Sequence, residues 1–193
     1  IEAAHPEVRC YRYWPELSSD CRLMTKLLRD LTDYSMSDQL TKQRSDLCNL
    51  LRRAYLSCLP LTEGTNKTLT YTSRVSCAYM PLDSPKMMEA LLNLIVNALD
   101  AVSDNGSVQI ILTKSKEQFV VSIIDDGCGI APKQLLTIFH PFTTTNPDGT
   151  GLGLPVAKRI IEGHGGHIRV SSAPNQGTTF TFLLPCSFSS DRK

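Results

Sequence analysis

Apolar residues recur at steps of three and four positions in five stretches of this chain, the spacing that places them on one face of a helix. We predict helices over residues 15–34, 46–59, 84–103, 132–139 and 155–162. Proline stands at or near the first turn of four of them, where its missing N–H costs no helical hydrogen bond. The third helix is the most periodic, and Asp104-Asn-Gly106 closes it.

Other stretches are rich in β-branched residues or alternate polar with apolar side chains, as strands do. We predict strands over residues 68–72, 78–82, 108–113, 119–124, 167–172 and 178–184. This order of elements predicts an α+β fold, a two-layer sandwich with three helices over one face of a mostly antiparallel sheet. The long amphipathic helix over residues 15–34 precedes the sandwich. Its apolar stripe suits either a core helix or half of a helical hairpin used for pairing.

Composition restricts the possible partners. The 20 Lys and Arg nearly balance the 19 Asp and Glu, and the net charge of +1 gives no reason to expect nucleic acid or an acidic membrane surface. No apolar run approaches the ~20 residues that span a bilayer. The seven cysteines are odd in number and include no C-x-x-C pair, which indicates reduced, mostly buried thiols. We therefore expect a cytoplasmic segment without membrane contact.

The segment Gly149-Thr-Gly-Leu-Gly-Leu154 is the first candidate for chemistry. Glycines at alternate positions leave backbone N–H groups uncovered, and the predicted helix that follows points its positive dipole end at the same place. Such a loop suits phosphate, although glycine-rich turns also serve close packing. The glycine spacing fits neither a P-loop nor a dinucleotide fingerprint.

Asn93 and Asn97 stand four residues apart, and therefore on one face of the most periodic helix. Carboxamides on an apolar helix are costly to bury unless their oxygens are used. A Mg²⁺ ion that bridges phosphates would use them, since it prefers oxygen ligands. The alternative is that both amides hold nearby backbone in place.

A carboxylate, Asp125, follows the predicted strand over residues 119–124. At the end of a strand it can accept a hydrogen bond from an exocyclic amine. Gly127 and Gly129 let a flat ring lie close to the backbone. A simple Asp-Gly turn explains only one of these glycines. Further along, Phe139-His-Pro-Phe142 places aromatic residues where they would hinge a mobile loop.

Taken in order, the asparagine pair, Asp-x-Gly-x-Gly (125–129), the aromatic segment and Gly-x-Gly-x-Gly-Leu (149–154) resemble the catalytic ATP-binding domain of bacterial sensor histidine kinases. That domain belongs to a wider class shared with DNA gyrase B, the Hsp90 chaperones and MutL. The resemblance covers roughly residues 44–185. It implies ATP and Mg²⁺ as cofactors, a response regulator as partner, and a homodimer formed through a helical hairpin.

The resemblance also implies a role for each matching residue. Asn97 would be the Mg²⁺ ligand, with Asn93 beside it toward the phosphates, and Asp125 would pair with the adenine amine. Residues 143–150 would form a lid over ATP. The nucleotide-binding residues that it implies are Asn93, Asn97, Asp125, Gly127, Gly129, Ile130, Gly149, Thr150, Gly151, Leu152, Gly153, Leu154 and Thr178.

One position separates phosphoryl transfer from hydrolysis. Members of the class that hydrolyse ATP place a water-activating glutamate four residues before the magnesium asparagine, where this chain has Asn93. An amide cannot act as a general base, and Glu89 lies one turn further away. We therefore expect transfer to a histidine side chain, which disfavours a gyrase-like ATPase.

The chain departs from a complete sensor kinase near its start. His5 is followed by Pro6 and not by an acidic residue, so we do not expect it to be the phosphoacceptor. We expect a fragment in which residues 1–43 end the dimerisation hairpin and residues 44–193 form the ATP-binding domain. The other histidines, His140, His164 and His167, are expected to be structural.

Two other functions use the same pocket. A protein serine kinase of the anti-sigma-factor type has no use for a dimerisation helix, so residues 15–38 argue against it. A non-catalytic nucleotide-binding scaffold has no need of the full set of asparagine, aspartate and glycine residues.

Overall fold

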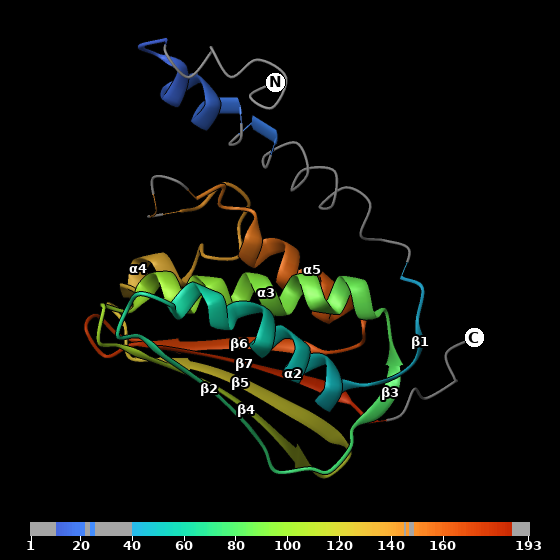
Figure 1. The fold of residues 1–193 in the computed structure, drawn as a ribbon. Helices are drawn as coiled ribbons and strands as arrows, with labels where there is room; N and C mark the ends of the chain where they lie inside the picture. The colour runs from blue at the N-terminus through green and yellow to red at the C-terminus, as the bar shows by residue number, and fades with distance from the viewer. Residues whose placement is uncertain (1–10, 22–23, 26–39, 145, 147–148, 187–193) are drawn as a thin grey trace.

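The computed structural model describes residues 11–21, 24–25, 40–144, 146 and 149–186. Within them, three helices lie over one face of a five-stranded sheet (Figure 1). They are α2 (Leu47–Cys58), α3 (Ser84–Ala101) and α5 (Gly153–Gly163). The predicted α+β sandwich with three helices over one face is confirmed.

The large sheet has the strand order β2-β4-β5-β7-β6. Its strands are β2 (Thr68–Ser73), β4 (Ser107–Ser115), β5 (Gln118–Asp125), β6 (His167–Ser172) and β7 (Thr178–Pro185). Neighbouring strands are antiparallel except for β2 and β4, which are parallel, so the sheet is mostly antiparallel as predicted. Along β5 and β7 buried residues alternate with less buried ones, because successive side chains point to opposite faces of a sheet.

A separate two-stranded sheet joins β1 (Gln43–Asp46) to β3 (Tyr79–Leu82) in antiparallel register. The strand at 78–82 was predicted, but its partner was not. The sequence Gln-Arg-Ser-Asp of β1 contains no apolar residue, and its side chains are exposed or half-buried, so no alternating pattern marks it as a strand. β1 lies directly between the N-terminal part of the chain and α2.

Two of the helices over the sheet begin at a capping aspartate. Asp46 Oδ1 accepts the N–H of Cys48 at 3.0 Å, and Asp83 Oδ1 accepts the N–H of Lys86 at 3.1 Å. Each bond satisfies an N–H that has no partner within its helix. A short 3₁₀ helix, Leu59–Thr62, follows α2.

The largest difference from the predicted helix boundaries is at α4, and a smaller one at α5 bears on the glycine segment. α4 (Pro132–Leu135) is a single turn and does not reach Phe139. After it the carbonyl of Gln134 accepts the N–H groups of both Thr137 and Ile138, and the chain continues as turns. α5 begins at Gly153, two residues before the predicted start, so Gly153 itself belongs to the first turn of α5.

The core lies between the helices and the sheet. The largest side chains without exposure include Leu91, Leu94 and Ile95 of α3, Ile110 and Leu112 of β4, Ile123 of β5 and Phe182 of β7. Full burial of one such side chain stabilises a fold by about 1.5–3 kcal/mol. The core therefore fixes α3 on the middle of the sheet, and with it Asn93 and Asn97.

Residues 14–21 and 24–25 are helical, and the remainder of the helix predicted over residues 15–34 lies outside the described residues. The apolar side chains of Leu17 and Met24 are exposed, which does not support the core-helix alternative. Among the helices that the structure describes, none is long and apolar enough to cross a bilayer.

The expectation that the cysteines are mostly buried is wrong. All six described cysteines are free thiols. However, only Cys58 is buried, while Cys21, Cys77 and Cys128 are exposed. The depth of a cysteine depends on the face of the element that carries it, which composition does not give.

Candidate functional site

Asp125 is the last residue of β5, and with Asp83 it is one of two buried acidic residues in the described part of the chain, with 5% of its surface exposed. Its Oδ1 accepts two backbone hydrogen bonds, from Gly127 and from Thr178, each at 3.0 Å. Burial raises the pKa of this carboxyl above its ordinary value, and the two hydrogen bonds oppose that shift. Asp125 and Thr178 are directly paired across β5 and β7, so the sheet itself fixes the carboxylate.

The second oxygen of Asp125 has no such partner. Both hydrogen bonds end at Oδ1, and no hydrogen bond within the described part of the chain ends at Oδ2. Among the described residues, no fully buried side-chain nitrogen or oxygen lacks a hydrogen-bond partner. Since Oδ2 has no partner among these residues, it must be accessible from outside the protein. An ionised carboxylate oxygen in this state can accept a hydrogen bond from an N–H of a ligand.

Both carboxylate oxygens of the neighbouring Asp126 accept hydrogen bonds from Ser107. Its Oδ1 accepts the N–H of Ser107 at 2.8 Å and its Oδ2 accepts the Ser107 hydroxyl at 2.7 Å. These bonds lower the pKa of Asp126. Of the two adjacent aspartates, Asp125 is therefore the one with an oxygen left for a ligand, and its contact with an adenine amine remains a prediction.

Ser172, at the end of β6, is a residue of this region that the sequence did not single out. Its hydroxyl accepts the N–H of Ile130 at 2.8 Å and donates to the carbonyl of Gly177 at 2.8 Å. It also lies 3.0 Å from the hydroxyl of Thr178. Ser172 thus joins the segment after Asp125 to the start of β7. A serine at the end of a strand carries no sequence signal for such a role.

Close packing of the backbone explains why positions 127 and 129 are glycines. A Cβ on Gly127 would lie 2.4 Å from the carbonyl oxygen of Ala101, at the end of α3. A Cβ on Gly129, whose φ is +67°, would lie 1.9 Å from the carbonyl oxygen of Ala173. Both positions exclude a side chain because protein backbone approaches them. Their predicted contact with a flat ring remains a prediction.

The two asparagines lie on α3 as predicted, but their burial differs. Asn93 is half-buried and Asn97 is exposed. The expected cost of burying two amides therefore does not apply to Asn97. A Cβ on Gly153 would lie 3.4 Å from Oδ1 of Asn93. The first turn of α5 thus lies directly against the asparagine face of α3.

The glycine segment forms the start of α5 and the turn before it. Gly151 has φ +67°, and its carbonyl accepts the N–H of Phe142 at 3.0 Å. Thr150 and Leu152 are buried, whereas Gly149 and Leu154 are half-buried. Among the residues that the structure describes, no side chain caps the first turn of α5. Uncapped first-turn N–H groups at the positive end of a helix are a site for an anion.

The aromatic segment borders this glycine turn. The ring of Phe139 packs edge-on against Phe180 with 6.4 Å between centroids, and Lys158 Nζ lies 5.3 Å from the Phe139 centroid. Phe142 is exposed and has φ +64°, an unusual conformation for a bulky side chain. Residues 145 and 147–148 of the predicted lid lie outside the described residues, so its mobility remains a prediction.

His164 has the structural role expected of it. Its ring is fully buried, Nε2 accepts the N–H of Asp83 at 2.9 Å, and Nδ1 lies 2.7 Å from the carbonyl oxygen of Ile160. Because the Asp83 N–H can only donate, Nε2 must be the unprotonated nitrogen and Nδ1 the donor. Burial lowers the pKa of this imidazole.

Residues 82–187 match the model of the histidine kinase-, DNA gyrase B- and HSP90-like ATPase family, and the chain belongs to that family. The match includes α3, the Asp125 turn and the glycine segment.

Among similar proteins, the sensor histidine kinase ZraS of Salmonella typhimurium strain LT2 is 31% identical over 170 residues, covering 88% of this chain. The catalytic domain of the histidine kinase ThkA has a similar structure, with a TM-score of 0.70, 28% identity, and coverage of 77% of this chain and 97% of that domain. ThkA in complex with the response regulator protein TrrA shares the fold, with a TM-score of 0.76 at 24% identity over 91% of this chain and 51% of ThkA. The chain spans only 37% of the length of ZraS.

Proposed function

We propose that this chain is the ATP-binding portion of a sensor histidine kinase, which transfers the γ-phosphoryl group of ATP to a histidine on a dimerisation helix. A response-regulator aspartate would then receive it. The observation that carries the proposal is Asp125, a buried carboxylate fixed by two backbone N–H groups, with a second oxygen left for a ligand. Membership of the family and the similarity to ZraS support the same function.

Adenine would lie at the end of β5. The Oδ2 atom of Asp125 would accept a hydrogen from the adenine amine, with Thr178 holding Oδ1 in place. Gly127, Gly129 and Ile130 would border the ring. This arrangement selects a base with an exocyclic amine, because a carboxylate cannot pair with a carbonyl at the same place.

The phosphates would lie between the first turn of α5 and the asparagine face of α3. Gly151, Leu152, Gly153 and Leu154 would contribute backbone N–H groups, and Gly149 and Thr150 would belong to the lid above. The contact between Gly153 and Asn93 supports this placement, because it brings the two phosphate-facing elements together.

Mg²⁺ would take the side-chain oxygen of Asn97 as a protein ligand. The residues present fit this ion, since Mg²⁺ keeps several waters and uses one or two protein oxygens together with substrate phosphates. Asn97 is exposed on α3, so its oxygen is accessible from solvent. Bound Mg²⁺ would neutralise charge on the phosphates during transfer.

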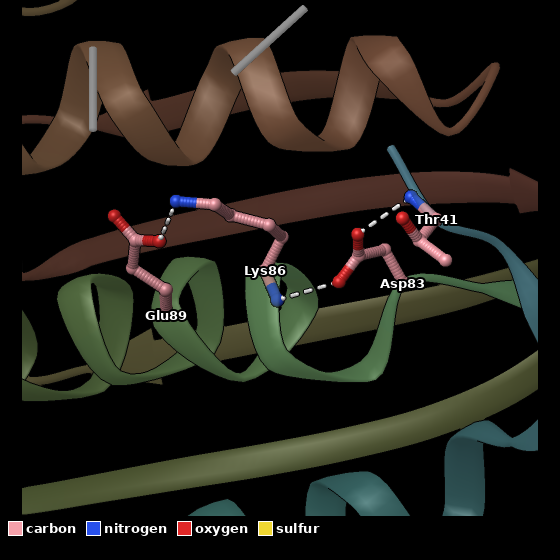
Figure 2. A network of polar contacts seen from close by, with 4 residues as sticks. All are labelled: Thr41, Asp83, Lys86 and Glu89. Carbon is pink, nitrogen blue, oxygen red and sulfur yellow. Dashed lines mark hydrogen bonds and ion pairs between the residues drawn. The ribbon is translucent and has the colours of Figure 1, made fainter. Parts of the chain in front are cut away.

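Transfer is favoured over hydrolysis by the side chains that precede Asn97. Asn93 stands where an activating glutamate would be needed, and an amide cannot take a proton from water. The acidic residue of α3 that precedes both asparagines, Glu89, forms an ion pair with Lys86 at 3.0 Å (Figure 2). The nucleophile would therefore come from outside the pocket, as a histidine side chain does.

Residues 1–43 would be the end of a dimerisation hairpin and residues 44–193 the ATP-binding domain, in a homodimeric parent protein located in the cytoplasm or facing it. A receiver domain would be the partner for phosphoryl transfer, and the complex of ThkA with a response regulator offers a precedent in a protein of the same fold. The similarity to a sensor histidine kinase disfavours a serine kinase or a non-catalytic scaffold.

The experiment uses γ-labelled ATP with this chain and a separately supplied hairpin that carries a phosphoacceptor histidine. The chain alone should bind ATP without labelling itself, and the hairpin should gain acid-labile phosphate. An Asn97→Ala variant should abolish labelling of the hairpin. Release of free phosphate at the same rate with or without the hairpin would favour an ATPase instead. Label on His5 would show that the chain carries its own acceptor.

A further inference from the structure

The residues that precede β1 are held against the fold by contacts that the nucleotide site does not use. The N–H of Thr41 donates to Asp83 Oδ2 at 2.8 Å (Figure 2). Lys42 Nζ donates to the carbonyl oxygen of Gly163 at 2.7 Å. Leu40 packs on the same glycine so closely that a Cβ there would lie 2.9 Å from Leu40 Cδ1. Residues 40–42, which we call the linker, are therefore anchored at three successive positions.

Asp83 has two separate tasks in this anchorage. Its Oδ1 caps α3 through the N–H of Lys86, and its Oδ2 holds the linker through the N–H of Thr41 (Figure 2). The residue is 8% exposed, so both hydrogen bonds also compensate a largely buried charge. Helix capping requires only one acceptor oxygen, and the second oxygen is the one that contacts the linker.

His164 connects this aspartate to α5. The ring accepts the backbone N–H of Asp83 through Nε2 and donates through Nδ1 to Ile160, in the last turns of α5. Gly163, which anchors Lys42, is the residue immediately before His164. We use the name clasp for one set of contacts. It comprises the hydrogen bond between Asp83 and His164, and the contacts of Asp83 and Gly163 with the linker.

The clasp lies at the ends of the two helices that build the nucleotide site. α3 begins next to Asp83 and carries Asn93 and Asn97 further along. α5 ends at Gly163 and begins at Gly153, in the glycine segment. The linker therefore contacts both helices at once, at positions remote from the proposed phosphate contacts.

We propose that the clasp sets the orientation of the ATP-binding fold relative to the segment before residue 40, and that Asp83 is a positioning residue for phosphoryl transfer. The inference rests on the function proposed above, in which the acceptor histidine belongs to the dimerisation hairpin. A released linker would leave the nucleotide site intact. It would reduce how often the bound γ-phosphate meets the acceptor in a reactive geometry.

The central variant is Asp83→Ser. Serine is a good N-cap, so it can still accept the N–H of Lys86, but it lacks the second oxygen that reaches Thr41. Asp46→Ser is the matched control, because Asp46 also caps a helix and accepts a second backbone N–H, that of Ala78, without contacting the linker. Lys42→Met is a second test that leaves Asp83 and the α3 cap unchanged.

In the chain itself, Asp83→Ser should raise the hydrogen-exchange rate of the Thr41 amide about tenfold, the scale of one lost hydrogen bond to a charged group. Its dissociation constant for ATP should stay within about twofold of the original, since no proposed nucleotide contact is removed. In the whole kinase that contains this chain, kcat for autophosphorylation should fall at least about tenfold while KM for ATP is unchanged. Lys42→Met should shift the same quantities in the same direction, and Asp46→Ser should shift none of them.

Two results would overturn the proposal. One is a Thr41 amide that is equally protected in the original chain and in both linker variants. The other is a loss of activity that appears in KM and in ATP affinity, because Asp83 would then act on the nucleotide site. If the unchanged chain fails to bind ATP, the proposed function fails, whereas the exchange data still decide whether the clasp holds the linker.

Discussion

Asp125 and Thr178 are directly paired across β5 and β7, and the backbone N–H of Thr178 donates to Asp125 Oδ1 at 3.0 Å. A side chain held by the sheet in this way keeps its second oxygen in a fixed place without any contribution from a ligand. Preorganisation of this kind reduces the cost of binding.

Replacement of Asp125 by Asn should weaken ATP binding. The amide can keep its oxygen on the N–H groups of Gly127 and Thr178, but it then presents an NH₂ group to the adenine amine. The loss of a charge-assisted hydrogen bond should reduce the binding free energy by about 1.5–3 kcal/mol in calorimetry. Asp126→Asn is the control and should bind ATP normally, because Asp126 is occupied by Ser107. Equal affinity in the two variants would contradict the adenine role of Asp125.

The same substitution should not weaken the ligand-free fold at neutral pH. Burial raises the pKa of Asp125, so the folded state holds its proton more readily than the unfolded chain does. Stability from this group is therefore present at acid pH and is lost as pH rises through the folded pKa. Asp125→Asn removes that loss. Urea unfolding should give a variant at least as stable as the original at pH 7, and a clear destabilisation there would show that the hydrogen bonds outweigh burial.

Gly129→Ala should destabilise the fold strongly. Its Cβ would overlap the carbonyl oxygen of Ala173 at 1.9 Å, and φ is +67°. Gly64→Ala is a matched control, because φ is +76° there and nothing lies within 4 Å of an added Cβ. The control should cost about 1–2 kcal/mol, the strain of the left-handed conformation alone. Gly129→Ala should cost several kcal/mol more in urea unfolding, and equal costs would mean that Ala173 moves aside freely.

His164 should make the stability of the fold depend on pH. Burial lowers its pKa, with Lys42 contributing in the same direction and Ile160 and Asp83 opposing it. As pH falls below the ordinary imidazole value of about 6.5, the unfolded chain binds a proton that the folded chain does not. The free energy of unfolding should therefore fall with pH down to the folded pKa, with a slope approaching 1.4 kcal/mol per pH unit, roughly the value for one proton.

The measurement compares urea unfolding between pH 5 and about pH 8, the range in which an imidazole titrates. His164→Gln retains an acceptor for the Asp83 N–H but cannot titrate, so its pH slope should be reduced by nearly one proton. The exposed His167 provides the control, since His167→Gln should leave the slope unchanged. Identical slopes in the two variants would mean that His164 is not the titrating group.

The sequence predicted most of the elements that carry the site, because those elements have strong periodicity. α3 and β5 were placed within two residues, and Asn93, Asn97 and Asp125 lie on them as predicted. β1 could not be predicted, since four polar residues form a strand there only by pairing with β3. Tertiary pairing of this kind leaves no local pattern.

Contacts between segments that are distant in the sequence likewise could not be predicted. Ser172 joins Ile130 to β7 through a single hydroxyl, and no spacing rule connects these positions. Gly129 was predicted to lie beneath a flat ring, which remains a prediction, whereas the approach of the Ala173 backbone to it becomes visible only in the folded chain. A motif can indicate that a glycine is needed at a position, but the contact that excludes a side chain there is known only from the folded structure.

The close approach of Gly127 to Ala101 has a consequence for nucleotide exchange. Ala101 ends the helix that carries Asn97, and its carbonyl also accepts the N–H of Cys128 at 3.1 Å. The turn after Asp125 is therefore fixed to the end of the asparagine helix, and we expect the distance between Asp125 and Asn97, the proposed contacts of the base and of Mg²⁺, to be the same with ATP, with ADP or with neither. A compound shaped to that distance should therefore bind with the same affinity whether or not a nucleotide has previously occupied the site.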